Sequence, residues 1–490
     1  MKPASVLSQS SRAQRICAAL LQPVDISFLI FFRIVFGAIM LWEVYRYFSY
    51  NWISRYYIEP TVYFTYYGFT WVKPWPGDGM YIHFYVLGVL AVCIIVGFFY
   101  RIAATLFFLS FTYVFLLDQT RYLNHFYLVV LISLLLIVLP AERALSVDAL
   151  LRPKLRSQVV PAWTLWLLRT QIGIVYFFGG IAKLNSDWLR GEPMRAWLSP
   201  VTKDPLIGHF FEKDWMVYSF AIGGLFFDLL VVPLLLWKRT RIYAFIASIA
   251  FNLMNALIFQ IGIFPWFMLG ATLIFFPPEL MRCFARAFAS PNESATSSPV
   301  QITSDPGLLA SVPTAALCSQ LSKRQKAFAA VLATYLAVQL VLPLRHFAYP
   351  GNVSWTEEGH NFAWHMKLRT KKADALFTVS HPATGQTWTV DPKEHLQLRQ
   401  VSKMVARPDM ILQFSHYLAE QKEREGYEGV EVRARVMASL NGRKPELLID
   451  PTADLAKEKL SIMPARWILP LTQPLPPRGT ASQARDDEDN

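Results

Sequence analysis

The stretch LWLLRTQIGIVYFFGGIAK, residues 165–183, is almost entirely apolar and ends in a single lysine. A run of about 20 apolar residues is long enough for a helix to cross a lipid bilayer. The whole chain of 490 residues has the same character, because 54% of its residues are hydrophobic and only 17% are charged. These proportions predict a mainly helical, multi-pass membrane protein.

Nine segments have the length and hydropathy expected of membrane spans. They lie near residues 26–47, 80–100, 102–117, 126–139, 163–182, 216–237, 243–261, 263–276 and 327–344. The division between the seventh and eighth, around Gly262 and Pro265, is the least sharply defined. This pattern predicts a transmembrane domain over residues 26–288 and a last span over residues 327–344.

The segments outside the spans complete the predicted domain organisation. Residues 1–25 are expected to form a cytoplasmic N-terminal segment, and residues 289–326, rich in Ser, Thr and Pro, a polar cytoplasmic loop. Residues 345–475 are expected to form an extracytoplasmic domain, and residues 476–490 a disordered tail.

The distribution of basic residues predicts the orientation of the chain. Lys and Arg clusters precede the first span, separate the fourth from the fifth, follow the sixth and precede the ninth. Because such clusters favour the cytoplasmic side, the N-terminus is expected in the cytoplasm and the C-terminal domain outside a bacterial cytoplasmic membrane or its equivalent. These loops also account for the net charge of +12, so nucleic acid is not an expected partner.

The extracytoplasmic domain has the signals of an α+β fold. Alternating segments flank residues 381–386, and a second pair flanks Asn441-Gly442, a strong hairpin signal. Residues 409–425, which follow Pro408, are typical of a helix. We therefore expect an α+β cap on a helical membrane domain.

Lys183 has two interpretations at the exterior end of the fifth span. Lysines near helix ends usually extend to the bilayer interface and act as anchors. The pair Gly179-Gly180, however, allows a helix or ligand to approach closely, and aromatic residues surround the lysine with apolar surface. Burial there would favour the neutral amine, which can act as a base.

The loop after the third span places further polar groups on the same side. Asn124 and His125 end this loop, and the topology puts both near Lys183 and the cap. A solvated turn is the alternative interpretation. Together with Lys183, these groups have the hydrogen-bonding capacity to bind and deprotonate a phenolic compound.

The chain resembles the vitamin K-dependent γ-glutamyl carboxylases along most of its length. The matching motifs are Phe115–Thr120 with Asn124-His125, Arg169–Phe177 with Gly180–Leu184, Asp187-Trp188, Met254-Asn255 with Ile261–Phe264, and Trp355-Thr356 with Phe362–Trp364.

This resemblance implies a membrane enzyme, a peptidyl-glutamate 4-carboxylase, which is a carbon–carbon lyase with vitamin K epoxidase activity. In that family a lysine amine, matched by Lys183, deprotonates vitamin K hydroquinone, whose anion then reacts with O2. The resulting strong base removes a γ-proton from a glutamyl residue of a protein substrate. The carbanion captures CO2, giving γ-carboxyglutamate, and the quinone leaves as its epoxide. A menaquinol-type quinol, O2 and CO2 are thus the implied co-substrates, and no metal is required.

The resemblance also assigns residues to roles. Lys183, His125 and Asn124 would be catalytic and would bind the quinol together with the matched residues Tyr176, Met254 and Asn255. The glutamyl substrate would bind at the segment containing Trp355, His360, Trp364 and Arg369. The alternative for this segment is a loop entering the cap with Trp364 in its core. Asn252 replaces a histidine of the family, so any role of that imidazole would be lost.

Two other functions remain open from the sequence. One is a quinol epoxidase that carboxylates nothing. The other is a non-enzymatic transporter or lipid-binding protein in which Lys183 would pair with a substrate anion.

Overall fold

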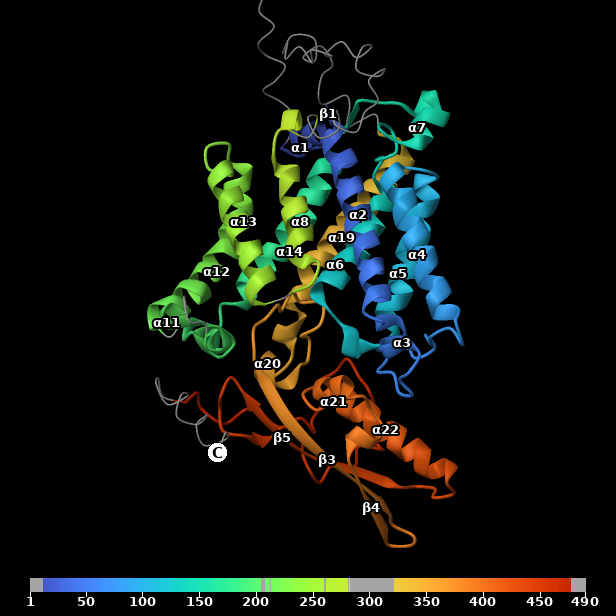
Figure 1. Ribbon diagram of the computed structural model, residues 1–490, viewed down its shortest axis with the longest axis vertical. Helices are drawn as coiled ribbons and strands as arrows, with labels where there is room; N and C mark the ends of the chain where they lie inside the picture. Colours follow the sequence, from blue (N-terminus) through green and yellow to red (C-terminus); the bar gives the residue numbers. More distant parts are fainter. Residues whose placement is uncertain are drawn as a thin grey trace, which may run out of the picture.

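The computed structural model describes residues 12–203, 208–211, 213–259, 261–280, 282 and 321–476. Most of the predicted polar loop, the predicted tail beyond residue 476 and the first 11 residues lie outside this part of the chain. In the described part a bundle of long helices stands on a smaller domain that contains a β-sheet (Figure 1).

The bundle contains a helix at each of the nine predicted spans. They are α2 (Ser27–Ser49), α4 (Gly79–Val96), α5 (Tyr100–Leu117), α6 (Asn124–Val138), α8 (Trp163–Ala182), α12 (Asp214–Leu236), α13 (Arg241–Ile258), α14 (Phe264–Thr272) and α19 (Lys323–Val341). By length and composition, seven of the described helices could cross a membrane, with α19 counted together with the 3-10 turn η6 (Leu342–Ala348). The mainly helical membrane fold is confirmed.

The helices α6 and α14 are shorter than a full crossing. The 15 residues of α6 rise about 22 Å, less than the roughly 30 Å of a bilayer core. Nine of these residues are buried by the protein, so most of this helix does not face lipid. A 3-10 turn, η5 (Leu273–Phe275), extends α14. Six of the nine residues of α14 are buried as well, so both helices lie largely inside the bundle.

Local sequence explains several helix ends. Gly97 has φ +65° and terminates α4, a conformation that glycine adopts without strain. Ser322 and Gln325 form a reciprocal capping box at the start of α19, and Pro343 follows its end. Short elements connect the long helices: α1 (Arg12–Leu21), α3 (Trp52–Tyr57), η2 (Gln119–Arg121), α7 (Val147–Leu151), η3 (Pro153–Leu155), α9 (Ser186–Leu189), α10 (Met194–Leu198), η4 (Ser199–Lys203) and α11 (Gly208–Phe211). The strands β1 (Pro23–Asp25) and β2 (Val159–Pro161) pair antiparallel.

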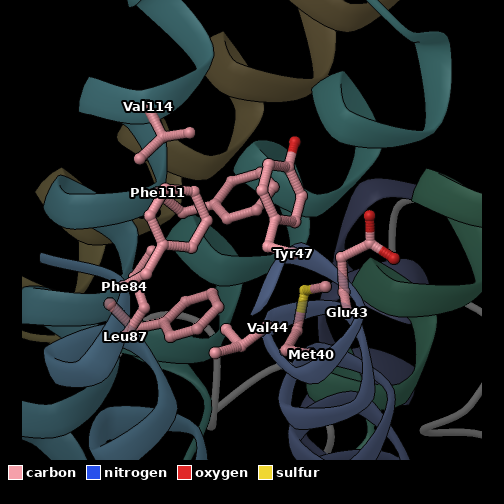
Figure 2. Close-up of a pocket in the computed structure, with 9 residues that line it drawn as sticks. Met40, Glu43, Val44, Tyr47, Phe84, Leu87, Phe111 and Val114 are labelled. Atoms are coloured by element: carbon pink, nitrogen blue, oxygen red, sulfur yellow. The ribbon is translucent and has the colours of Figure 1, made fainter. Parts of the chain in front are cut away.

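The helices α2, α4 and α5 pack tightly against one another. The cavity between them measures about 10 Å³, room for at most one water molecule, and apolar side chains form most of its wall (Figure 2). Glu43 is the acidic residue at its edge, and its Oε2 lies 2.7 Å from Nη1 of Arg46. An ion pair within one helix thus neutralises a buried carboxylate.

The cap contains a four-stranded antiparallel sheet in the order β4-β3-β5-β6. Both predicted hairpins and the predicted helix are present. The hydrophobic core of the cap includes Phe377 of β3 and Phe414 of α22, whose rings are 4.9 Å apart. The elements are η6, α20 (Val353–Thr356), β3 (Lys371–His381), β4 (Gln386–Val390), η7 (Pro392–Glu394), α21 (Leu398–Met404), α22 (Pro408–Arg424), β5 (Glu431–Leu440) and β6 (Glu446–Leu447).

Charged and polar side chains join the cap to the loops of the bundle. Asp187 of α9 accepts hydrogen bonds from Nη1 and Nη2 of Arg443 at 2.6 and 2.8 Å, and from Asn441 at 2.7 Å. Gln119 donates to Asp409 at 2.7 Å. The cap therefore sits at the end of the bundle that carries residues 118–125 and 183–189, as the topology predicted. The compartment that the cap faces stays a prediction.

Candidate active site

Lys183 is buried at the C-terminal end of α8. Its side chain is 8% exposed, and it forms an ion pair with Asp228 of α12, whose side chain is 5% exposed. The Lys183 Nζ also donates to the carbonyl of Gly179 at 3.1 Å. The amine points into the bundle, not toward the interface, so the anchor interpretation does not fit.

The pair Gly179-Gly180 makes this arrangement possible, as predicted. A Cβ at residue 180 would lie 2.6 Å from Cδ2 of Leu229, so only glycine lets α12 approach this closely. A Cβ at residue 179 would lie 3.3 Å from Oδ2 of Asp228 and 3.1 Å from Cε of Met366. The two glycines thus admit a helix on one side and a segment of the cap region on the other.

Aromatic side chains enclose the ion pair. The Lys183 Nζ lies 5.4 Å from the centre of the Trp188 ring, and Trp188 Nε1 donates to the carbonyl of Ala221. The Tyr176 ring contacts Phe227 at 5.8 Å, one residue before Asp228. Flat apolar walls around a polar group suit a planar aromatic alcohol such as a quinol.

Asn124 connects this region to the residues around Met366. Its Oδ1 accepts from the Tyr122 hydroxyl, and its Nδ2 donates to the carbonyl of His365, both at 3.0 Å. His365 immediately precedes Met366, which contacts Gly179 beside the ion pair. The segment 365–366 therefore bridges two site residues that are 59 positions apart in the sequence.

His125 does not share the contacts of Asn124 and packs against other residues. Its half-buried ring packs against Phe126 and against Phe264 of α14, with ring centres 4.9 and 6.0 Å apart. The guanidinium of Arg46 lies within electrostatic range of this ring. These contacts tie His125 to α2 and α14, whereas Asn124 holds the segment 365–366.

Helix α13, which carries the matched residues Met254 and Asn255, approaches the Lys183–Asp228 ion pair at Asn252. Asn252 and Asn255 are both buried and lie three positions apart, so they share a helix face. Asn252 lies within electrostatic range of the Tyr176 hydroxyl and donates to the carbonyl of Ser248. Met254 is half-buried on the same helix. An amide thus lies beside the Tyr176 ring on this face of α13.

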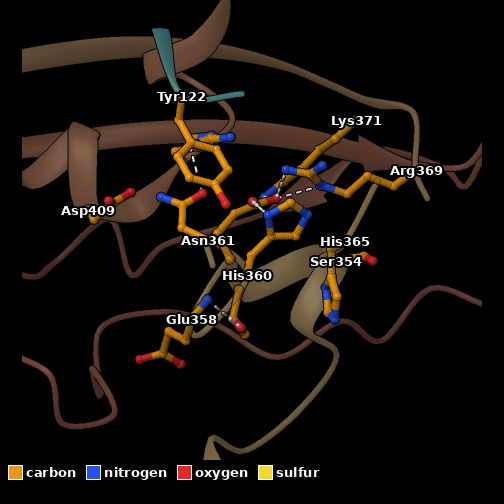
Figure 3. A network of polar contacts seen from close by, with 12 residues as sticks. Tyr122, Ser354, Glu358, His360, Asn361, His365, Arg369, Lys371 and Asp409 are labelled. Carbon is orange, nitrogen blue, oxygen red and sulfur yellow. Dashed lines mark hydrogen bonds and ion pairs between the residues drawn. The ribbon is translucent and has the colours of Figure 1, made fainter. Parts of the chain in front are cut away.

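A second polar cluster lies where the cap meets the bundle (Figure 3). Glu357 is its central carboxylate: Arg369 Nε donates to Glu357 Oε1 at 2.6 Å, and Lys371 Nζ lies 3.9 Å from the same oxygen. The Nδ1 atom of His360 lies 3.8 Å from Glu357 Oε2. One carboxylate therefore faces two basic side chains and a histidine.

Burial controls the protonation of this cluster. Desolvation, helped by nearby positive charges, places the pKa of His360 well below its usual range and lowers the pKa of His365 to about 3. Desolvation likewise lowers the pKa of Lys371 to about 7, although Glu357 opposes the shift. Both histidines are therefore neutral near pH 7. Among the described residues, no group of three or more His, Cys, Asp or Glu side chains could hold a metal ion.

A cavity of about 580 Å³ adjoins the cluster. Its wall includes Tyr66, Arg345, Glu357 and Phe362, together with residues 458–468 of the cap. Within the described part of the chain, both ring nitrogens of His360 and of His365 are buried without a hydrogen-bond partner. Oε2 of Glu357, which lines the cavity, is likewise buried without a partner in this part of the chain, and such unsatisfied polar atoms call for a ligand or water.

The two tryptophans of the predicted substrate segment are fully buried. Trp355 Nε1 donates to the carbonyl of Leu469 at 2.8 Å, and the Trp364 ring lies 5.0 Å from that of Tyr127. Trp364 is therefore a core residue, as the alternative interpretation had it. His360 and Arg369 belong instead to the polar cluster.

Sequence reasoning missed Asp228 and Glu357. A signal for Asp228 was available, because it is the one acidic residue within the apolar run from Met216 to Trp237. An ionisable residue inside a span marks a functional site by default, and Lys183 was its natural partner. Glu357 offered no such signal, because a carboxylate in a loop is usually solvated.

Two family models match the chain. The HTTM domain matches residues 21–280, more than half of the chain, and the model described as vitamin K-dependent gamma-carboxylase, lumenal domain, matches residues 324–474. The first covers the helical bundle through η5, and the second covers α19 and the cap. No solved structure matches significantly.

Proposed function

Because the chain belongs to the vitamin K-dependent gamma-carboxylase family, we propose that it is a membrane-bound peptidyl-glutamate carboxylase that also converts vitamin K hydroquinone to its epoxide. The observation that supports this most directly is the buried amine of Lys183, enclosed by aromatic rings at the end of the bundle that meets the cap. When bound there, the hydroquinone would supply, by reaction with O2, a base strong enough to remove a γ-proton.

Lys183 is proposed to take the phenolic proton of the hydroquinone. Trp188, Tyr176 and Phe227 would hold the ring and keep water out, which a strong base requires. Met254 and Asn255 would complete the quinol site from α13. Asn124 would keep the segment 365–366 against the pair through its bond to the His365 carbonyl. His125, from its place beside Phe264, would contact the quinol at the side of α14.

The polar cluster of the cap is proposed to receive the glutamyl side chain. Arg369 would bind its carboxylate, and the neutral His360 would offer a ring N–H without adding charge. The buried Trp355 and Trp364 would hold the segment in place. The cavity beside the cluster is large enough for part of a peptide. The quinol site at the end of the bundle and the peptide site in the cap would thus lie at the same end of the molecule.

The pairing of Lys183 weighs against a transporter. A substrate anion would have to displace Asp228 from the amine, and that would leave a buried carboxylate without a partner.

Product analysis with purified protein in lipid nanodiscs tests the proposal. The assay supplies vitamin K hydroquinone, O2, labelled bicarbonate and a glutamyl peptide. Label in the γ-carboxyl group together with epoxide supports the proposed function. Epoxide without label would identify a quinol epoxidase and refute the carboxylase. Folded protein that forms neither the labelled peptide nor the epoxide would refute both activities.

A further inference from the structure

Asp228 lies within α12, among apolar neighbours. Its side chain is buried, and its Oδ2 accepts a hydrogen bond from Nζ of Lys183. An ionisable group inside a membrane span is destabilising and is retained where it serves a function. The roles proposed so far for Lys183 and the quinol do not use this carboxylate.

The charges of Lys183 and Asp228 balance each other. The neighbouring titratable and polar groups are uncharged or already engaged: Tyr176 of α8, Asn252 of α13, Asp187 of α9, which binds Arg443, and Lys367, which lies over the rings of Trp197 and Phe259. In the described part of the chain, the two residues therefore form an isolated neutral unit that contains one mobile proton.

A lysine that donates to a carboxylate is not yet a base. The ammonium has no lone pair, so Lys183 must release a proton before it can accept one from a phenol. Asp228 Oδ2 is in direct contact with the donor. Burial removes both charged groups from water, and the transfer of one proton from the amine to the carboxylate cancels both charges at once.

We propose that Asp228 is the proton store of Lys183, a positioning residue that makes the amine a base. As the hydroquinone binds, an N–H bond of Lys183 breaks and an O–H bond forms at Asp228. The neutral amine then takes the phenolic proton, so that an O–H bond of the hydroquinone breaks and the N–H bond is restored. This inference rests on the proposed function for the identity of the phenol.

The charge of the site stays at zero throughout these steps. Before binding, the ammonium and the carboxylate cancel; afterwards, the ammonium and the phenolate cancel and Asp228 is a neutral acid. No proton or counter-ion needs to cross from water. A lysine without Asp228 would exchange its proton with solvent, so its reaction would depend on external pH.

Two spectroscopic signals in wild-type protein test this directly without turnover. Nanodisc protein carrying carboxyl-labelled aspartate is mixed with vitamin K hydroquinone under anaerobic conditions. Phenolate absorbance should appear together with an isotope-sensitive infrared band of a carboxylic acid. Asp228→Asn should remove that band and make the phenolate signal depend on external pH. Asp228→Glu should restore the acid band and the pH-independent phenolate signal, with the acid band then insensitive to the aspartate label.

Asp148→Asn is the matched control. Asp148 is also buried in the bundle, but it accepts from the backbone N–H groups of Phe99 and Tyr100 at 3.0 and 2.8 Å. Its removal should leave both signals at wild-type strength. A phenolate signal that stays independent of pH in Asp228→Asn, or the absence of the acid band from wild-type protein, would overturn the proposal.

The pH dependence of epoxide formation gives a second readout. The wild-type rate should be level across the neutral range, whereas the rate of Asp228→Asn should rise with pH as the lone amine loses its proton to water. An equally level profile for the variant would overturn the proposal. Anaerobic signals in a protein that then makes no γ-carboxyglutamate would refute the carboxylase and leave the role of Asp228 standing.

Discussion

The ion pair in the bundle and the polar cluster in the cap both bury charge, but they balance it differently. Lys183 faces one carboxylate, so the pair is neutral. In the cap, Arg369 and Lys371 share the single carboxylate of Glu357. A neutral pair can move a proton without creating net charge, whereas the cap cluster carries excess positive charge when Lys371 is protonated and can then bind an anion. The contrast suggests that one region performs base chemistry and the other holds the glutamyl carboxylate.

The largest effect is expected from breaking the pair at Lys183. Lys183→Ala should lower epoxide formation by about 10²- to 10⁴-fold, the usual contribution of a general base. Added small primary amines should restore part of the rate. Lys183→Arg keeps the charge and a partner for Asp228, but guanidinium does not give up its proton, so this variant should stay inactive. Epoxide measured by chromatography checks the series, and an active Lys183→Arg would contradict the base role.

The second-largest effect is expected at the ion pair between Arg443 and Asp187, which joins the cap to the bundle. Arg443→Gln leaves Asp187 buried without its partner, so the free energy of unfolding should fall by about 3–5 kcal/mol. Asp187→Asn with Arg443→Gln removes both charges and should lose less. Thermal unfolding in nanodiscs measures the difference. Equal losses in the single and double variants would show that the ion pair is not what joins the cap to the bundle.

A smaller effect, confined to the cap, is expected at Arg369. Arg369→Gln removes a charged donor and should raise the KM for a glutamyl peptide about 10- to 100-fold, which corresponds to about 1.4–2.8 kcal/mol. Epoxide formation without peptide should not change. Arg435 is exposed on β5, so Arg435→Gln is the matched control and should behave as wild type. A loss of epoxide formation in Arg369→Gln would show that the polar cluster also contributes to the base chemistry at the ion pair.

The smallest effect is a pH dependence at Lys371. A lysine is charged below its pKa, so Lys371, with a pKa lowered to about 7, adds positive charge below pH 7 and loses it above. The peptide carboxylate stays ionised across this range, so its KM should rise with pH, by about fivefold, which corresponds to roughly 1 kcal/mol. Lys371→Arg should remove the dependence, whereas Lys372→Arg, at an exposed neighbour, should keep it. A dependence that persists in Lys371→Arg would assign it to another group.

Much of the fold followed from local patterns. The apolar runs predicted nine helices, and the positive φ of Asn441 and Gly442 matches the hairpin that this dipeptide indicated. Gly179 and Gly180 predicted a close approach that the structure contains. The short lengths of α6 and α14 were harder to foresee, because a hydropathy pattern does not show which helices other helices will enclose.

The sequence alone determined that this protein is a helical membrane protein with an α+β cap and that Lys183, Asn124 and His125 lie at the end of the bundle nearest the cap. These features depend on composition and on short-range periodicity. Only the tertiary structure decided that Lys183 faces Asp228, 45 residues later, that Asn124 meets residue 365, and that His125 turns toward Phe264. Such pairings depend on how helices distant in the chain pack together, and in a buried site that packing decides which charges meet.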